Sequence, residues 1–140
     1  MKIIAKTLEG LEQILADEIR DIGGKNIEIL NRAVAFTGDI TTLYKANLLL
    51  RTTIKVLVFL KEFQIRNEND LYDEVMKLPW EDYFSLDQTF AIDSVVNSSQ
   101  FNHANFISLK TKDAIVDRFR QKFGSRPSVD TSDPHLKINV

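Results

Sequence analysis

Residues 2–24, KIIAKTLEGLEQILADEIRDIGG, decide the fold of the first part of the chain, because they contain two hydrophobic patterns in succession. Residues 2–6 form a short apolar run between lysines, which predicts a strand. From residue 8 onward the apolar residues recur every three or four positions, which predicts an amphipathic helix. These apolar residues are Leu8, Leu11, Leu15, Ile19 and Ile22. Gly23 and Gly24 follow and are expected to end the helix.

The next residues predict a hairpin and a second helix. Large apolar residues occupy every second position on either side of the polar link 31–32, namely Ile27, Ile29, Val34 and Phe36, which predicts two half-buried strands. Asp39 follows Gly38 in a position that suits a helix N-cap. The second helix is expected to end near residue 51. Its apolar residues are Ile40, Leu43, Leu48 and Leu50.

The most β-like stretch of the chain is VLVFL, residues 56–60, within the longer run 53–65. Because it is continuously apolar, it predicts a strand that is covered on both faces and lies inside a sheet. The first 65 residues then follow the order strand, helix, strand, strand, helix, strand, which is that of a ferredoxin-like split βαβ domain. The predicted fold class is α+β, with a domain boundary at residues 66–68. Proteins with this fold have many different functions, so the fold alone does not indicate the function of this chain.

Residues 67–140 predict a second α/β unit. Asn67 is placed to cap a helix, and Pro79 opens a short turn that contains Trp80. A strand at residues 89–96, a helix at 105–123 and a strand at 136–140 follow. The stripe expected to face the core of the last helix consists of Leu109, Val116, Phe119 and Phe123.

Charge is unevenly distributed along this chain of net charge -2. Residues 62–93 contain nine acidic residues and only two basic ones, whereas residues 101–127 contain six basic residues and only two acidic ones. The basic residues are Lys110, Lys112, Arg118, Arg120, Lys122 and Arg126. Such a distribution predicts an anion-facing surface, with the acidic segment facing away from it. Lysines near a helix start, beside free backbone N–H groups, could hold a phosphate. The alternative is an ordinary solvated helix face.

Several other functions find little support in the sequence. Cysteine is absent, which excludes disulfides and thiolate chemistry. No apolar run is long enough to span a membrane. Asp130, Asp133 and His135 lack the spacing of metal ligands and suit a turn, so no metal site is predicted. The candidates for stacking against nucleic-acid bases are Trp80, Tyr83, Phe84 and Phe101.

Short motifs along the whole chain resemble one protein family. They are LEGLE at residues 8–12, GD at 38–39, DLY at 70–72, KTKDAIVD at 110–117 and RPSVD at 126–130. Together they resemble the N-terminal region of the large-subunit ribosomal RNA guanine-N2 methyltransferases, a family often labelled N6-adenine-specific DNA methylases. The resemblance implies a ferredoxin-like domain at residues 1–66 and a THUMP domain, an RNA-binding module, at 67–140. The THUMP domain is expected to be truncated at its C-terminus.

The resemblance also implies a function. Family members continue into a domain that binds S-adenosylmethionine, but its Gly-rich loop and its Asn-Pro-Pro-aromatic motif are missing from this sequence. We therefore expect an RNA-binding, substrate-recruiting region of a parent methyltransferase, a region that binds no cofactor and is not catalytic alone. The expected partners are ribosomal RNA and the parent's own methyltransferase domain, in the cytoplasm and without a membrane. The basic positions implied to meet RNA are Lys110, Lys112 and Arg126, with Arg118 and Lys122 beside them.

Three alternatives remain open at this point. The chain could belong to a DNA adenine methylase rather than to an RNA methyltransferase. It could be a protein-interaction domain that uses the acidic segment 62–93. It could also be a small ferredoxin-like enzyme, although the sequence offers no convincing pair of nucleophile and base.

Overall fold

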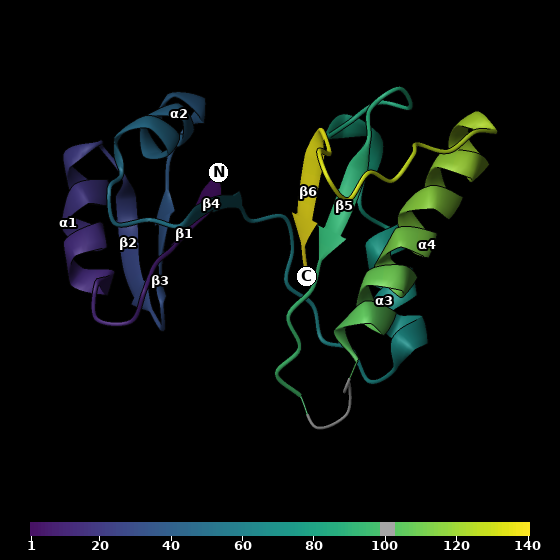
Figure 1. The fold of residues 1–140 in the computed structure, drawn as a ribbon, viewed down its shortest axis with the longest axis horizontal. Coiled ribbons are helices and arrows are strands. Elements are labelled where there is room, and N and C mark those ends of the chain that lie inside the picture. Colours follow the sequence, from purple (N-terminus) through teal and green to yellow (C-terminus); the bar gives the residue numbers. More distant parts are fainter. Residues whose placement is uncertain (99–102) are drawn as a thin grey trace. The chain divides into compact units, whose positions relative to one another are not determined.

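The computed structural model describes residues 1–98 and 103–140, which form two compact units, Met1–Glu62 (unit 1) and Phe63–Val140 (unit 2) (Figure 1). Both units combine helices with strands. The predicted α+β class is therefore confirmed.

Unit 1 contains the six elements in the predicted order. They are β1 (Lys2–Lys6), α1 (Glu12–Asp21), β2 (Lys25–Leu30), β3 (Ala33–Thr37), α2 (Ile40–Leu49) and β4 (Lys55–Val58). The strands form one antiparallel sheet in the order β2-β3-β1-β4. Figure 1 shows α1 lying along this sheet. The split βαβ arrangement predicted from the pattern is present.

The core of unit 1 lies between the two helices and one face of the sheet. Ile3 and Ala5 of β1 and Val34 and Phe36 of β3 are buried there, and they pack against helix residues. The helix residues of this cluster are Leu15, Ala16, Ile19 and Ala46. A Cβ atom on Gly24 would lie 2.4 Å from the Ile19 side chain, so only glycine lets the chain turn back this close to the helix.

The predicted N-cap of α2 is confirmed, and the predicted apolar face of α2 is partly right, because Leu43 and Leu50 pack against the core whereas Ile40 and Leu48 are exposed. Asp39 Oδ1 accepts a hydrogen bond of 2.8 Å from the backbone N–H of Thr42. The buried residues of α2 are the small ones, Thr42 and Ala46, which let the helix lie close to the sheet. Leu48 is on the opposite side and is 81% exposed.

The strand predicted at residues 56–60 is also different from expectation. β4 ends at Val58 and pairs only with β1, so it lies at the edge of the sheet rather than inside it. Val58 is exposed. A continuous apolar run does not distinguish a central strand from an edge strand, because both can carry side chains that are partly covered.

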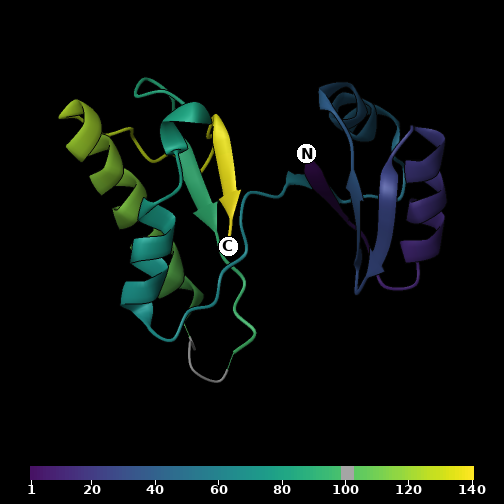
Figure 2. The ribbon, with the colours of Figure 1, turned by 180° about the vertical axis from the view of Figure 1, so that it is seen from behind.

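Unit 2 places two helices beside a small parallel sheet. Its elements are α3 (Glu68–Met76), the short 3-10 helix η1 (Trp80–Asp82), β5 (Phe90–Asp93), α4 (Ala104–Phe123) and β6 (Leu136–Asn139). The strands β5 and β6 pair in parallel. Figures 1 and 2, seen from opposite sides, both show α3 lying alongside α4.

Aromatic side chains form much of the core of unit 2. The Phe84 ring centroid lies 5.0 Å from that of Phe119 and 5.3 Å from that of Phe90. Trp80 is buried, and its Nε1 donates a 2.8 Å hydrogen bond to the carbonyl of Val75. Phe119 therefore lies in the core as predicted.

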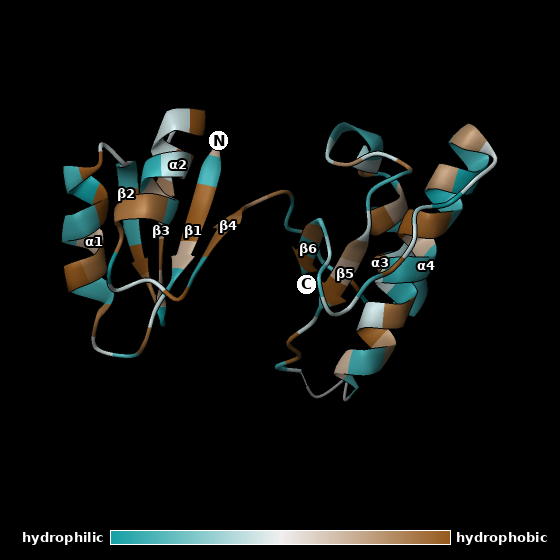
Figure 3. Cartoon of the chain, turned by 45° about the horizontal axis from the view of Figure 1, so that its top comes forward, coloured by the Kyte–Doolittle hydropathy of each residue, from teal (hydrophilic) through white to brown (hydrophobic). Residues whose placement is uncertain are grey.

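The rest of the stripe predicted on α4 is partly wrong. Leu109 and Phe123 are 56% and 50% exposed. The buried residues of α4 are Ile107, Thr111, Ala114, Ile115, Val116 and Phe119. Val116 and Phe119 were predicted, whereas the buried Ile107, Thr111, Ala114 and Ile115 lie outside the predicted stripe. In Figure 3 hydrophobic and hydrophilic residues are mixed along α4.

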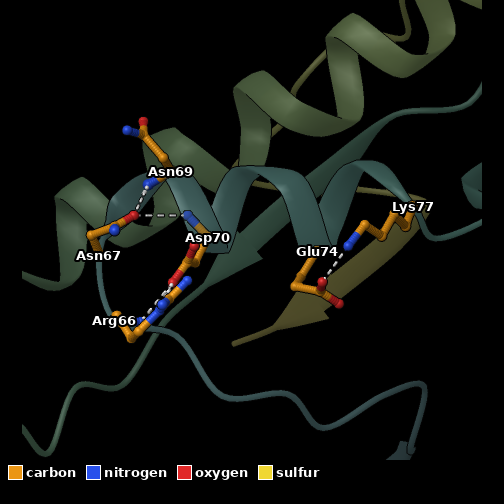
Figure 4. A network of polar contacts seen from close by, with 6 residues as sticks. All are labelled: Arg66, Asn67, Asn69, Asp70, Glu74 and Lys77. Atoms are coloured by element: carbon orange, nitrogen blue, oxygen red, sulfur yellow. Dashed lines mark hydrogen bonds and ion pairs between the residues drawn. The ribbon is translucent and has the colours of Figure 1, made fainter.

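The start of α3 is fixed by the cap that the sequence predicts. Asn67 Oδ1 accepts hydrogen bonds of 3.0 Å from the backbone N–H groups of Asn69 and Asp70 (Figure 4). Arg66 Nε donates to the Asp70 carboxylate at 3.1 Å, which lowers the pKa of Asp70. These contacts satisfy N–H groups that have no partner inside the helix.

Candidate nucleic-acid interface

Four of the five predicted RNA-binding residues lie on α4 and the fifth, Arg126, follows it. Because α4 begins at Ala104, Lys110 and Lys112 lie in its second and third turns. Their backbone N–H groups are therefore inside the helix rather than among the free donors of its first turn. The prediction that these lysines and free N–H groups hold a phosphate together is wrong.

Arg118 is engaged inside unit 2. Its Nε and Nη2 donate hydrogen bonds of 2.7 Å to the two carboxylate oxygens of Glu81, and its Nη1 donates a 2.9 Å bond to the carbonyl of Met76. The Arg118 hydrogen bonds hold the pKa of Glu81 far below its usual value. The two side chains are 23% and 12% exposed. Arg118 therefore joins α4 to η1, and its contact with RNA stays a prediction.

Lys122 shares the same carboxylate. Its Nζ forms an ion pair with Glu81 one turn of helix beyond Arg118. Its side chain is half exposed, at 51%. Lys122 is thus more accessible than Arg118, but part of its charge is balanced by Glu81.

Lys110 lies over an aromatic ring of the neighbouring helix. Its Nζ is 5.7 Å from the centroid of the Tyr72 ring of α3, which is within the range of a cation–π interaction. The Tyr72 hydroxyl donates a 2.7 Å hydrogen bond to the Asp117 carboxylate, and this bond raises the pKa of Tyr72 to about 12. Tyr72 thus connects α3 to α4 and positions Lys110 at the surface between them.

Lys112 and Arg126 have fewer restraints. Lys112 Nζ is 2.9 Å from the Asp113 carboxylate, an adjacent and largely exposed group. Arg126 follows Gly124, which ends α4 in the left-handed conformation at φ 71°. Arg126 is exposed, whereas the next residue, Pro127, is buried and anchors the loop. Lys110 and the end of α4 are about 20 Å apart along the helix, so these cations form an extended surface rather than one pocket.

The charge separation seen along the sequence is not kept in space. Glu81 belongs to the acidic segment 62–93, yet it contacts Arg118 and Lys122 of the basic helix. The prediction that the acidic segment faces away from the basic helix is therefore wrong at Glu81. The net charge of a segment does not reveal which of its carboxylates are already paired.

The other residues considered from the sequence have mainly structural roles. Trp80 and Phe84 are buried, Tyr83 is 45% exposed, and Phe101 lies outside the described residues. Asp130 Oδ1 accepts hydrogen bonds from the backbone N–H groups of Ser132 and Asp133. The His135 ring lies within hydrogen-bond distance of Thr89. These contacts hold the loop before β6.

The two adjacent glycines of the chain, Gly23 and Gly24, lie after a helix end. Gly23 and Gly24 follow the end of α1 instead of opening a helix, and Gly24 packs against Ile19 and Phe36. This glycine pair therefore ends a helix and does not form a glycine-rich loop of the kind that opens one.

Comparison with known proteins follows the same division of the chain. The family model described as THUMP domain matches residues 65–140, and the model described as RlmL ferredoxin-like domain matches residues 2–57. The chain belongs to the THUMP domain family. The family resemblance that the short motifs indicate is thereby confirmed. The THUMP segment contains all five predicted cations.

The relatives of this THUMP chain are longer proteins. A ribosomal RNA large subunit methyltransferase K/L from Syntrophotalea carbinolica is 35% identical over 140 residues, which cover 100% of this chain and 20% of that relative. A solved structure from Listeria monocytogenes, described as a predicted N6-adenine-specific DNA methylase, superposes with a TM-score of 0.88 at 28% identity. SMU.472, solved in complex with SAH, gives a TM-score of 0.85 at 29% identity. Both alignments cover 99% of this chain, and they cover 36% and 37% of the solved chains.

Sequence reasoning missed two residues that shape this surface, Glu81 and Tyr72. One signal was available for Glu81, because Arg118 and Lys122 are four residues apart and can therefore reach a common carboxylate. No comparable signal pointed to Tyr72, because its bond to Asp117 joins residues 45 positions apart.

No helix of the described residues is long and apolar enough to cross a membrane.

Proposed function

We propose that this chain is the RNA-binding, substrate-recruiting region of an S-adenosylmethionine-dependent methyltransferase whose substrate is large-subunit ribosomal RNA, with guanine as the target base. One observation supports this most strongly: the THUMP family segment, residues 65–140, includes the exposed or partly exposed cations Lys110, Lys112 and Arg126. The name of the Syntrophotalea carbinolica relative supports ribosomal RNA as the substrate class.

The proposed role of this region is to position the parent enzyme on its RNA substrate. Lysine and arginine contacts to phosphates fix the place and orientation of a protein on RNA but carry little sequence information. The chemical step, including extrusion of the target base and binding of the cofactor, then belongs to another domain of the parent. The same proposal places the parent in the cytoplasm.

DNA is the second candidate substrate, because the Listeria monocytogenes protein is described as a predicted N6-adenine-specific DNA methylase. A competition experiment distinguishes RNA from DNA as the preferred ligand. The chain is bound to a labelled RNA hairpin, and unlabelled RNA and DNA hairpins of the same sequence are added in parallel. We expect RNA to compete more effectively, since the 2′-hydroxyl groups and the A-form shape are available only in RNA. Stronger competition by DNA would reverse the assignment.

A further inference from the structure

The sheet of unit 1 has one face that its helices leave uncovered. Ile3 and Ala5 of β1 point into the core with α1 and α2. Since successive side chains of a strand point to opposite faces, Lys2, Ile4 and Lys6 lie on the other side, which we call the open face. Lys2 and Lys6 are exposed. In Figure 3 β1 is hydrophilic where it starts beside the N-terminus and hydrophobic further on.

The strand register brings a third lysine to the open face. Lys6 pairs with Lys55 of β4 on one side and with Ala33 of β3 on the other. Ile4 pairs with Leu57 and Ala35 in the same way. Residues opposite each other in adjacent strands point to the same face. Lys2, Lys6 and Lys55 therefore share the open face, and the two alanines of β3 lie buried between the larger side chains of this face.

An aromatic ring completes this arrangement. The backbone N–H of Phe59, just after β4, donates a 3.0 Å hydrogen bond to the carbonyl of Lys2. The Lys2 Nζ lies 4.8 Å from the centroid of the Phe59 ring. The ring is thus beside a cation on the open face. Lys2 and Lys6 are four residues apart on one strand, or about 13 Å.

Charge is separated between the two sides of unit 1. The helix side carries two cations, Arg20 of α1 and Lys45 of α2, against four acidic residues of α1, which are Glu12, Asp17, Glu18 and Asp21. On the open face, the register places only one acidic residue of the described strands, Glu28, which pairs with Ala35 at the far edge. The open face therefore suits an anionic partner, and the helix side does not.

We propose that the open face binds an unpaired segment of the RNA substrate, with Lys2 and Lys6 on phosphates and a base on the Phe59 ring. This inference rests on the proposed function and adds a second contact surface to it. A polyanion with exposed aromatic bases matches both features of the face, since single-stranded nucleic acids bind to basic surfaces that carry stacking rings. A flat sheet offers such a surface without a pocket.

The test uses the full 140-residue chain and two labelled probes, an unstructured 12-nucleotide RNA and a fully paired RNA hairpin. The variant Lys2→Gln/Lys6→Gln removes two cations from the open face, and Arg20→Gln/Lys45→Gln removes two from the helices of the same unit. On the unstructured probe we expect the slope of log affinity against log salt to become less negative by about 1.4 only in the open-face variant. Phe59→Leu should weaken binding of the unstructured probe by about five-fold or more and leave binding of the hairpin unchanged.

The outcomes separate this inference from the proposed function. Equal slopes in the open-face variant and the helix-side control, with RNA still bound through Lys110, Lys112 and Arg126, would overturn the open-face site alone. A chain that binds neither probe at low salt would overturn both. If Phe59→Leu perturbs folding, the lysine variants still decide, because both replaced side chains are exposed.

Discussion

Glu81 of η1 and Arg118 of α4 form a two-pronged ion pair in which both N–O distances are 2.7 Å. The pair joins segments 37 residues apart and is largely shielded from water. It also uses the guanidinium geometry that would otherwise suit a phosphate. Arg118 is therefore better explained as a residue that stabilises the THUMP unit than as one that contacts RNA.

Replacing Glu81 by glutamine should destabilise unit 2. Glu81→Gln leaves the shielded Arg118 cation without its carboxylate, which we expect to lower the free energy of unfolding by about 2 kcal/mol. Trp80 is the single tryptophan of the chain and is buried in unit 2, so its fluorescence during urea unfolding reports on this unit. Asp73→Asn, at an exposed position of α3, is the control and should change stability by less than about 0.5 kcal/mol. Equal stability of Glu81→Gln and the control would contradict the structural role.

The same ion pair should make stability depend on pH. Because the pKa of Glu81 is lower in the folded state than its ordinary value of 4.5, its contribution is complete above the ordinary value and is lost as the pH falls below it. The stability difference between the natural chain and Glu81→Gln should therefore be constant above about pH 5.5 and shrink as the pH falls below about 5. Urea unfolding at a series of pH values checks this. A difference that grows on acidification would have the wrong sign.

Tyr72→Phe separates stability from binding. The change removes the 2.7 Å hydrogen bond to Asp117 but keeps the ring beneath Lys110. We expect a loss of about 1 kcal/mol in the free energy of unfolding, since Asp117 is partly exposed and remains hydrated. RNA affinity should stay the same. A large loss of affinity in this variant would show that the Tyr72 hydroxyl itself takes part in binding.

The predictions from sequence succeeded where a local pattern determines a local structure. The Asp39 and Asn67 caps, the turn after β2 and the end of α4 at Gly124 were all predicted, because each depends on a few neighbouring residues. The ferredoxin-like strand order followed from the order of the elements. Such features require no knowledge of distant contacts.

The errors arose where distant contacts decide. Leu48 and Leu109 have helical spacing with other apolar residues, yet both are exposed, and smaller residues such as Ala46 and Ala114 are buried instead. The charge count of residues 62–93 concealed the pairing of Glu81, which exists only when η1 packs against α4. The open face of unit 1 was missed because Lys2, Lys6 and Lys55 are brought together only by the strand register.

A cofactor titration tests independently whether RNA recruitment and cofactor binding belong to different domains of the parent. The chain has no glycine-rich loop opening a helix in its sequence, so titration with S-adenosylmethionine in a calorimeter should give no saturable heat in the micromolar range. Saturable binding would show that the 140 residues contain a cofactor site of a different design. The proposed recruiting role would then have to include catalysis.

The most direct test of the central claim is the salt dependence of RNA binding, measured by filter binding with Lys110→Gln/Lys112→Gln/Arg126→Gln. If each of these residues contacts one phosphate, the slope of log affinity against log salt should become less negative by about 2 to 3 relative to the natural chain. All RNA sequences should be weakened about equally, since phosphate contacts position without specifying. An unchanged slope in the triple variant would contradict the claim that this surface of the THUMP unit binds RNA.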